Sequence, residues 1–93
     1  MVIVTRGSEA AQLRRHWGQN LQLHLDEAIP EPITRKELQR RLAEIGYEVS
    51  LQAISLWLRG EAAPRAAMQA AIAKVLGVPA RSLFPLPTVP EVA

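Results

Sequence analysis

Residues 50–64 of this chain read SLQAISLWLRGEAAP, and this stretch decides the fold that the sequence predicts. The Ser50 hydroxyl can cap the first turn of a short helix, and Gly60 is suited to end it. Ile54 and Trp57 are three residues apart, so they share one helix face and are expected to point into a core. Pro64 follows the loop and suits the first turn of the next helix.

Residues 34–49, TRKELQRRLAEIGYEV, predict a second capped helix directly upstream. Thr34 and Glu37 have the spacing of a capping box, and Gly46 is expected to end the helix. Its predicted buried stripe consists of Leu38, Leu42 and Ile45. Two short helices joined by a tight turn, the second with a polar face, fit the major groove of DNA.

The rest of the chain predicts three further helices. The first is expected to begin at a cap formed by Ser8 and to end before Pro30. Its apolar side chains recur every four residues, at Leu13, Trp17, Leu21 and Leu25. A fourth helix is expected over residues 64–77, and a last short turn over residues 80–84. The side chains of that turn that are expected to reach the core are Leu83 and Phe84.

No internal repeat and no convincing strand alternation is present, so the predicted fold is all-α. We expect a compact bundle of about five helices with a helix-turn-helix. The predicted organisation is a flexible N-terminus at residues 1–7, a DNA-binding domain at residues 8–84 and a proline-rich tail at residues 85–93.

Composition narrows the class of protein. The chain has 93 residues, 48% of them hydrophobic, which suits one small folded domain. It has no cysteine, so disulfides and thiolate metal sites are excluded. No apolar run approaches the ~18 residues of a membrane span, and the start does not resemble a secretory signal. We therefore expect a cytoplasmic protein, associated with the nucleoid or, if phage-encoded, with the host cytoplasm.

The outward face of the helix at residues 50–59 is the candidate for contacts with bases. The amide of Gln52 can pair twice with adenine, and Ser55 can reach a base or a phosphate. Leu51 and Leu56 are suited to contact thymine methyl groups. The alternatives are an ordinary solvent-exposed face, or a surface on which these leucines meet a partner protein.

Cations of the helix at residues 34–45 are candidates for phosphate contacts. Arg35 and Lys36 stand near the helix start, where they oppose the dipole and favour an external anion. Arg41 can instead pair with Glu37 along the helix. The full set of expected backbone contacts is Thr34, Arg35, Lys36, Arg40, Ser50, Arg59 and Arg65. Phosphate contact and plain surface exposure are equally compatible with Arg14 and Arg15.

No pattern of catalytic or metal-binding residues is present. His16 and His24 lie eight residues apart, roughly 12 Å along a helix, so they cannot share a metal. Trp17 and Trp57 are expected in the core rather than as platforms for bases. No phosphate loop or nucleophile elbow is found, so neither an enzyme nor a cofactor is expected.

Two motifs together resemble the Cro/CI-type helix-turn-helix regulators, also called the XRE family. They are VSLQAISLWLRGEAAP at residues 49–64 and IAKVLGVPARSLF at residues 72–84, and the resemblance covers residues 34–84. It implies a lambda-repressor-like fold and base reading by Leu51, Gln52 and Leu56, with Ser55 beside them. It also implies that Thr34 and Arg35 meet the DNA backbone.

The chain departs from the family pattern in two places. Between Leu38 and Ile54 it is about five residues longer than the compact phage repressors, which resembles an actinobacterial or phage-like subset with an extended second helix. Leu58 stands where the family often has Glu, so a polar contact near the loop is missing.

The function expected from these observations is sequence-specific binding of double-stranded DNA by a regulator of transcription, a repressor of the phage lysogeny or lysis type. The alternative is an antitoxin or adaptor that uses the same scaffold to bind a protein through Leu51, Leu56 and Leu58. A homodimer interface can form through the C-terminal segment, which carries Leu83, Phe84 and Leu86.

Overall fold

The computed structural model describes residues 6–86, and this part of the chain is helical, without a strand. Its elements are α1 (Arg6–Asp26), α2 (Arg35–Glu44), α3 (Leu51–Arg59), α4 (Ala66–Leu76) and α5 (Ala80–Leu83). The all-α prediction with five helices is therefore confirmed for these residues.

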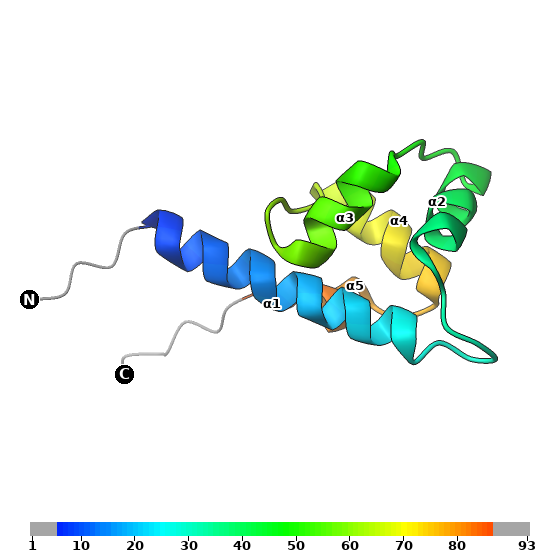
Figure 1. The fold of residues 1–93 in the computed structure, drawn as a ribbon, viewed down its shortest axis with the longest axis horizontal. Helices are drawn as coiled ribbons and strands as arrows, with labels where there is room; N and C mark the ends of the chain where they lie inside the picture. The colour runs from blue at the N-terminus through cyan, green and yellow to red at the C-terminus, as the bar shows by residue number, and fades with distance from the viewer. Residues whose placement is uncertain (1–5, 87–93) are drawn as a thin grey trace, which may run out of the picture.

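The long helix α1 runs along one side of the other four helices, and its N-terminal part extends beyond them (Figure 1). Helix α1 packs against α3 and α5, while α2 packs against α3 and α4. Helix α5 lies against the end of α4, from which it is separated by a short turn. This arrangement leaves α3 supported from below by α1 and from the side by α2.

The core lies where the apolar faces of all five helices meet. Its side chains are Leu21, Leu25, Ile33, Leu38, Leu42, Ile54, Trp57, Ala71, Ile72, Ala73, Leu83 and Phe84. The predicted inward position of Ile54 and Trp57 on α3 is confirmed, with relative exposures of 0% and 8%. Burial of such apolar side chains is the dominant favourable contribution to folding.

Two glycines allow α1 and the end of α3 to meet backbone against backbone. A Cβ atom at Gly18 would lie 2.5 Å from the carbonyl oxygen of Trp57 and 2.6 Å from that of Leu58. A Cβ atom at Gly60 would lie 2.6 Å from the Cα atom of Arg15. Gly60 also has a φ of +76°, the left-handed conformation that ends α3.

Helix ends follow the predicted caps in most places. The Oγ1 of Thr34 accepts from the amide of Glu37 at 3.1 Å, and the Oγ of Ser50 accepts from that of Ala53 at 3.0 Å. The predicted stops at Gly60 and Gly77 are confirmed too. The caps therefore fix the boundaries of α2, α3 and α4 largely through local chemistry.

Three local predictions are wrong. Helix α1 begins at Arg6, so Ser8 lies inside the helix rather than capping it. Ile45 is 37% exposed and forms the non-helical C-cap of α2, so it lies beyond the last helical residue and does not continue the buried stripe of Leu38 and Leu42. Pro64 precedes the N-cap residue, Arg65, and so lies outside α4.

The C-terminal turn packs against α1, which corrects the predicted dimer interface. The predicted burial of Leu83 and Phe84 in the core is confirmed, with relative exposures of 0% and 4%, so these two side chains are not available to a dimer interface. Trp17 contacts Phe84 edge to face, and its Nε1 donates to the carbonyl oxygen of Pro85 at 2.8 Å. Leu86 remains 79% exposed. The rest of the predicted tail, and residues 1–5 of the predicted N-terminus, lie outside the described residues.

None of the described helices combines the length and the apolar character that crossing a bilayer requires.

Replacing Gly18 by Ala tests the contact between α1 and α3. The new methyl group would meet backbone carbonyl oxygens, which cannot rotate away as a side chain would. We expect overpacking to lower the free energy of unfolding by about 1–3 kcal/mol, against the ~1 kcal/mol gain in helix propensity that Ala gives. Urea denaturation measures the change. Gln19→Ala, one residue on at an exposed position, is the control and should not destabilise. A stabilised Gly18→Ala protein would contradict the contact.

Candidate nucleic-acid interface

Helix α3 is built to hold a defined outward face. Ser50 fixes where the helix begins, and Ile54 and Trp57 fix which side points inward. Gln52 is exposed in the first turn, on the side opposite the core. This geometry leaves one amide side chain free to hydrogen-bond with a large partner.

The other side chains predicted to contact bases are less exposed than Gln52. Leu51, Ser55 and Leu56 are each half-buried. Ser55 and Leu56 follow Gln52 at three and four residues, so they flank it on the same face of α3. Leu58 is half-buried and packs against the core, so it does not belong to that outward face.

One hydrogen bond joins α2 to the outward face of α3. The Nη1 of Arg35 donates to the Oγ of Ser55 at 2.8 Å. The guanidinium of Arg35 is thereby held beside the middle of α3, although the residue is exposed. A predicted phosphate contact and a predicted base contact thus lie side by side.

The first turn of α2 presents further polar groups. Thr34 uses its hydroxyl oxygen as the helix cap, which leaves its hydrogen available to an outside acceptor. Lys36 is exposed and forms no ion pair with any of residues 6–86 that the structure describes. These groups lie at the positive end of the helix dipole, where a bound anion is stabilised.

The charge of Arg40 is balanced by acidic neighbours on the same helix. It forms ion pairs with Glu37 and, at 3.0 Å, with Glu44. The predicted pair of Arg41 with Glu37 is confirmed at 2.8 Å. Hydrogen bonds from Arg40 and Arg41 lower the pKa of Glu37 to about 2, and the Glu37 carboxylate raises the pKa of Arg40. A phosphate would compete with these carboxylates for Arg40.

The remaining expected backbone contacts flank α3. Ser50 is exposed at its start, and Arg59 is exposed at its end, where it pairs with Glu61 at 2.6 Å. Arg65 is exposed at the N-cap of α4 and is without an ion-pair partner in the described part of the chain. Arg65 is therefore the freer of the two arginines.

The connection between α2 and α3, residues 45–50, is anchored by a side chain that the sequence did not single out. The Nε2 of Gln39 donates to the carbonyl oxygen of Val49 at 2.9 Å. The amide of Tyr47 donates to the carbonyl oxygen of Leu42 at 2.9 Å. Gly46 has a φ of +92°, which lets the chain turn between these two bonds. These bonds hold the six-residue connection in a defined path between α2 and α3.

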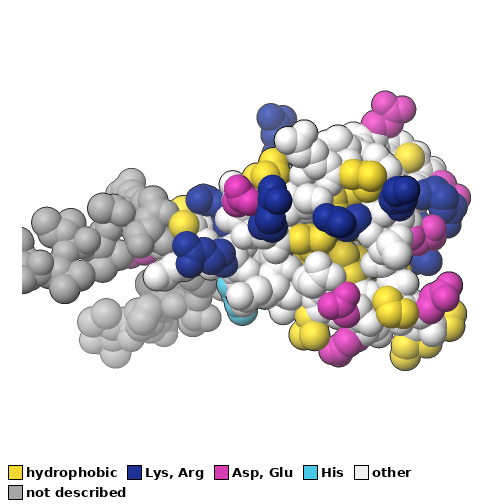
Figure 2. Space-filling model, viewed as in Figure 1, with side chains coloured by type: hydrophobic (Ala, Val, Ile, Leu, Met, Phe, Trp, Pro, Cys, Tyr) yellow, Lys and Arg dark blue, Asp and Glu magenta, His cyan; other side chains and the backbone are white. Residues whose placement is uncertain are grey.

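Positive side chains extend along one face of the molecule. Figure 2 shows Lys and Arg over the N-terminal part of α1, over α3 and over α2, with Asp and Glu between and below them. Arg15 is exposed on α1, whereas Arg14 is half-buried and its Nε is without a partner among the described residues. The face is therefore mixed in charge, with its unpaired cations close to α3.

The described residues contain no candidate metal site. They contain no group of three or more His, Cys, Asp or Glu side chains placed to share an ion. The Nδ1 of His24 lies 2.9 Å from the carbonyl oxygen of Asn20, within its own helix, and His16 is exposed.

Comparison of the chain with models of protein families, with curated proteins and with solved structures finds no match.

The ion pairs of Glu37 predict a pH dependence of stability. Its folded-state pKa of about 2 lies below the ordinary value of 4.5, so the unfolded chain takes up the proton first as pH falls. The stabilisation is complete above pH 4.5 and is lost as pH falls through 4.5 toward 2. Thermal denaturation across this range should show a shallower decline for Glu37→Gln than for the unsubstituted protein.

The control for that experiment is Glu48→Gln, an exposed carboxylate outside the ion pairs of the described residues. It should retain the original slope. Parallel curves for Glu37→Gln and the unsubstituted protein would show that the pairs contribute nothing to stability.

Proposed function

We propose that this protein binds double-stranded DNA in a sequence-specific manner and regulates transcription, acting as a repressor. The observation that carries the proposal is the exposed Gln52 in the capped first turn of α3, beside a guanidinium that α2 holds against the same helix. An amide reads adenine through two hydrogen bonds, and a neighbouring cation binds the phosphate that positions the helix.

The α2–α3 pair supports a helix-turn-helix role for these elements. Both helices are short, each is capped by a hydroxyl side chain, and two hydrogen bonds tie them or their connection together. The sequence resemblance to the Cro/CI-type family points to the same use. In that arrangement α3 enters the major groove while α2 lies across the backbone.

Electrostatics favour a small number of phosphate contacts. Arg35, Lys36 and Arg65 have no carboxylate partner among the described residues, whereas Arg40 and Arg59 are paired. The net charge of +2 agrees with a local rather than a global attraction to nucleic acid.

A second candidate is a protein-binding module such as an antitoxin or adaptor. Leu51 and Leu56, both half-buried on α3, are the observation that favours it. The two functions differ in their response to salt, because DNA binding releases counterions and weakens steeply, whereas an apolar protein contact responds little.

Gln52→Ala tests base reading. We first select a binding site from a random duplex library and then measure affinity by fluorescence anisotropy. The substitution should cost about 1–3 kcal/mol at one base position and relax the preference there. Gln19→Ala, an exposed amide on α1, is the matched control and should leave the preference intact. An unchanged base preference for Gln52→Ala would remove α3 from the interface.

Lys36→Ala tests the phosphate contacts through the dependence of affinity on salt. It should weaken binding to all sequences and reduce the slope of log affinity against log salt by about one. Arg81→Ala removes an exposed cation from α5 and should leave the slope unchanged. Failure of the selection, together with equal slopes for all variants, would favour the protein-binding module.

A further inference from the structure

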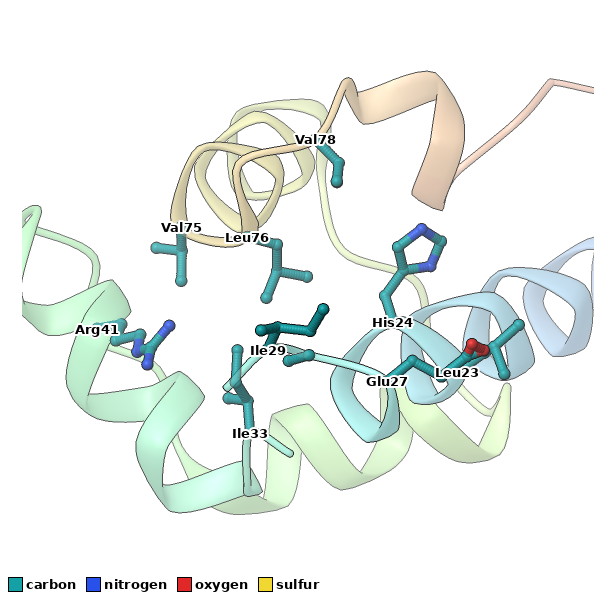
Figure 3. A pocket seen from close by; sticks show the side chains of 10 residues that line it. Leu23, His24, Glu27, Ile29, Ile33, Arg41, Val75, Leu76 and Val78 are labelled. Atoms are coloured by element: carbon teal, nitrogen blue, oxygen red, sulfur yellow. The ribbon is translucent and has the colours of Figure 1, made fainter. Parts of the chain in front are cut away.

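An apolar groove opens on the side of the molecule formed by the end of α1, the segment between α1 and α2, and the end of α4 (Figure 3). Its volume is about 430 Å³. The large apolar side chains that line it are Leu23, Ile29, Ile33, Val75, Leu76 and Val78. None of these residues belongs to α3 or to the first turn of α2, so the groove is separate from the proposed DNA interface.

Ile29 is the most exposed large apolar side chain of the described residues. Its relative exposure is 94%, and Leu23 beside the groove is 52% exposed. Figure 3 places Ile29 next to Ile33 in the middle of the groove, facing Leu76. Removing a branched aliphatic side chain from water is favourable in proportion to the apolar area buried. An isoleucine that stands exposed over an apolar groove is therefore placed to contact a second such groove.

The two ends of the groove carry opposite charges. Arg41 stands at one end and Glu27 at the other, with the apolar side chains between them (Figure 3). Among the described residues, Arg41 is engaged through its Nε alone, by Glu37. Glu27 is exposed and forms no ion pair within the described part of the chain. The order along the surface is thus positive, apolar, negative.

A surface with this order is complementary to itself. A two-fold axis through its apolar centre reverses the direction of the second copy, so Glu27 of each copy faces Arg41 of the other. The same rotation brings the two Ile29 side chains together across the axis, each against the groove of the opposite chain. A partner of a single charge sign would leave one end of the groove opposed or unpaired.

We propose that this groove is the interface of a two-fold symmetric homodimer, in which Ile29 of each chain enters the groove of the other and Glu27 pairs with Arg41 across the axis.

The experiment measures mass and dimer dissociation without DNA, so its outcome is independent of the proposed function. Light scattering after gel filtration, over a series of concentrations, should give a mass approaching twice the 10.3 kDa of the chain. Ile29→Asp should raise the dissociation constant about tenfold or more, as expected when an interface anchor is lost. Because Ile29 is almost fully exposed, its circular dichroism spectrum should stay unchanged.

A charge variant and a matched control complete the test. Glu27→Arg places two arginines together in the dimer and should also weaken it, whereas Glu48→Arg, in the connection between α2 and α3, should not. Leu86→Asp removes the other strongly exposed apolar side chain, near the C-terminal end of the described chain, and should leave the dimer intact. A monomer at every concentration, or a dimer that Leu86→Asp disrupts and Ile29→Asp does not, would overturn the proposal.

Discussion

The contact between the backbone of α1 and the C-terminal end of α3 is the constraint on which the rest of the arrangement depends. It exists because Gly18 has no side chain and because Gly60 takes a conformation that favours glycine. Where two helices meet backbone against backbone, a change of side-chain rotamer cannot alter their relative position. The orientation of α3, and hence the direction in which Gln52 points, is therefore set by α1 from beneath the helix rather than by the outward face itself.

The charges of α2 divide into two groups with different tasks. Glu37 holds Arg40 and Arg41, so this part of the helix is stabilised within the chain. Arg35 donates to Ser55 on α3, and Lys36 has no acidic partner within residues 6–86; both stand in the first turn of α2. A bound phosphate there would gain the helix dipole and two cations without breaking an existing ion pair. A phosphate bound by Arg35 and Lys36 would therefore leave the ion pairs of α2 intact. A phosphate bound by Arg40 would have to displace Glu37 or Glu44 from that side chain.

The sequence predicts those features that depend on a few neighbouring residues. The hydroxyl caps at Thr34 and Ser50 and the glycine stop at Gly77 are confirmed, because each rests on one local hydrogen bond or one backbone conformation. The burial of Ile54 and Trp57 is confirmed as well, because helical spacing fixes a shared face. Local pattern therefore accounts for the helices and for the inward side of α3.

Features that depend on contacts between distant segments could not be predicted from the sequence. The role of Gly18 requires knowledge of where α3 lies, since a glycine within a helix otherwise indicates only a weak position. The bond from Arg35 to Ser55 spans 20 residues, so spacing alone suggested a free cation. The bond from the Trp17 indole to the carbonyl oxygen of Pro85 likewise joins residues 68 positions apart, a pairing that local spacing does not reveal. The residues of the candidate interface could thus be predicted from their type and spacing. The hydrogen bond between Arg35 and Ser55 could not.

The edge-to-face contact of Trp17 with Phe84 gives the two halves of the molecule separate optical reporters. The indole of Trp17 is half-buried and bonded to the carbonyl oxygen of Pro85, so its emission depends on whether the C-terminal turn is docked on α1. The indole of Trp57 is buried on the inner face of α3, so its emission depends on how α3 packs against the core. Since the chain has only these two tryptophans, replacing either by Phe leaves a single indole, and the surroundings of the C-terminal turn and of α3 can be followed one at a time.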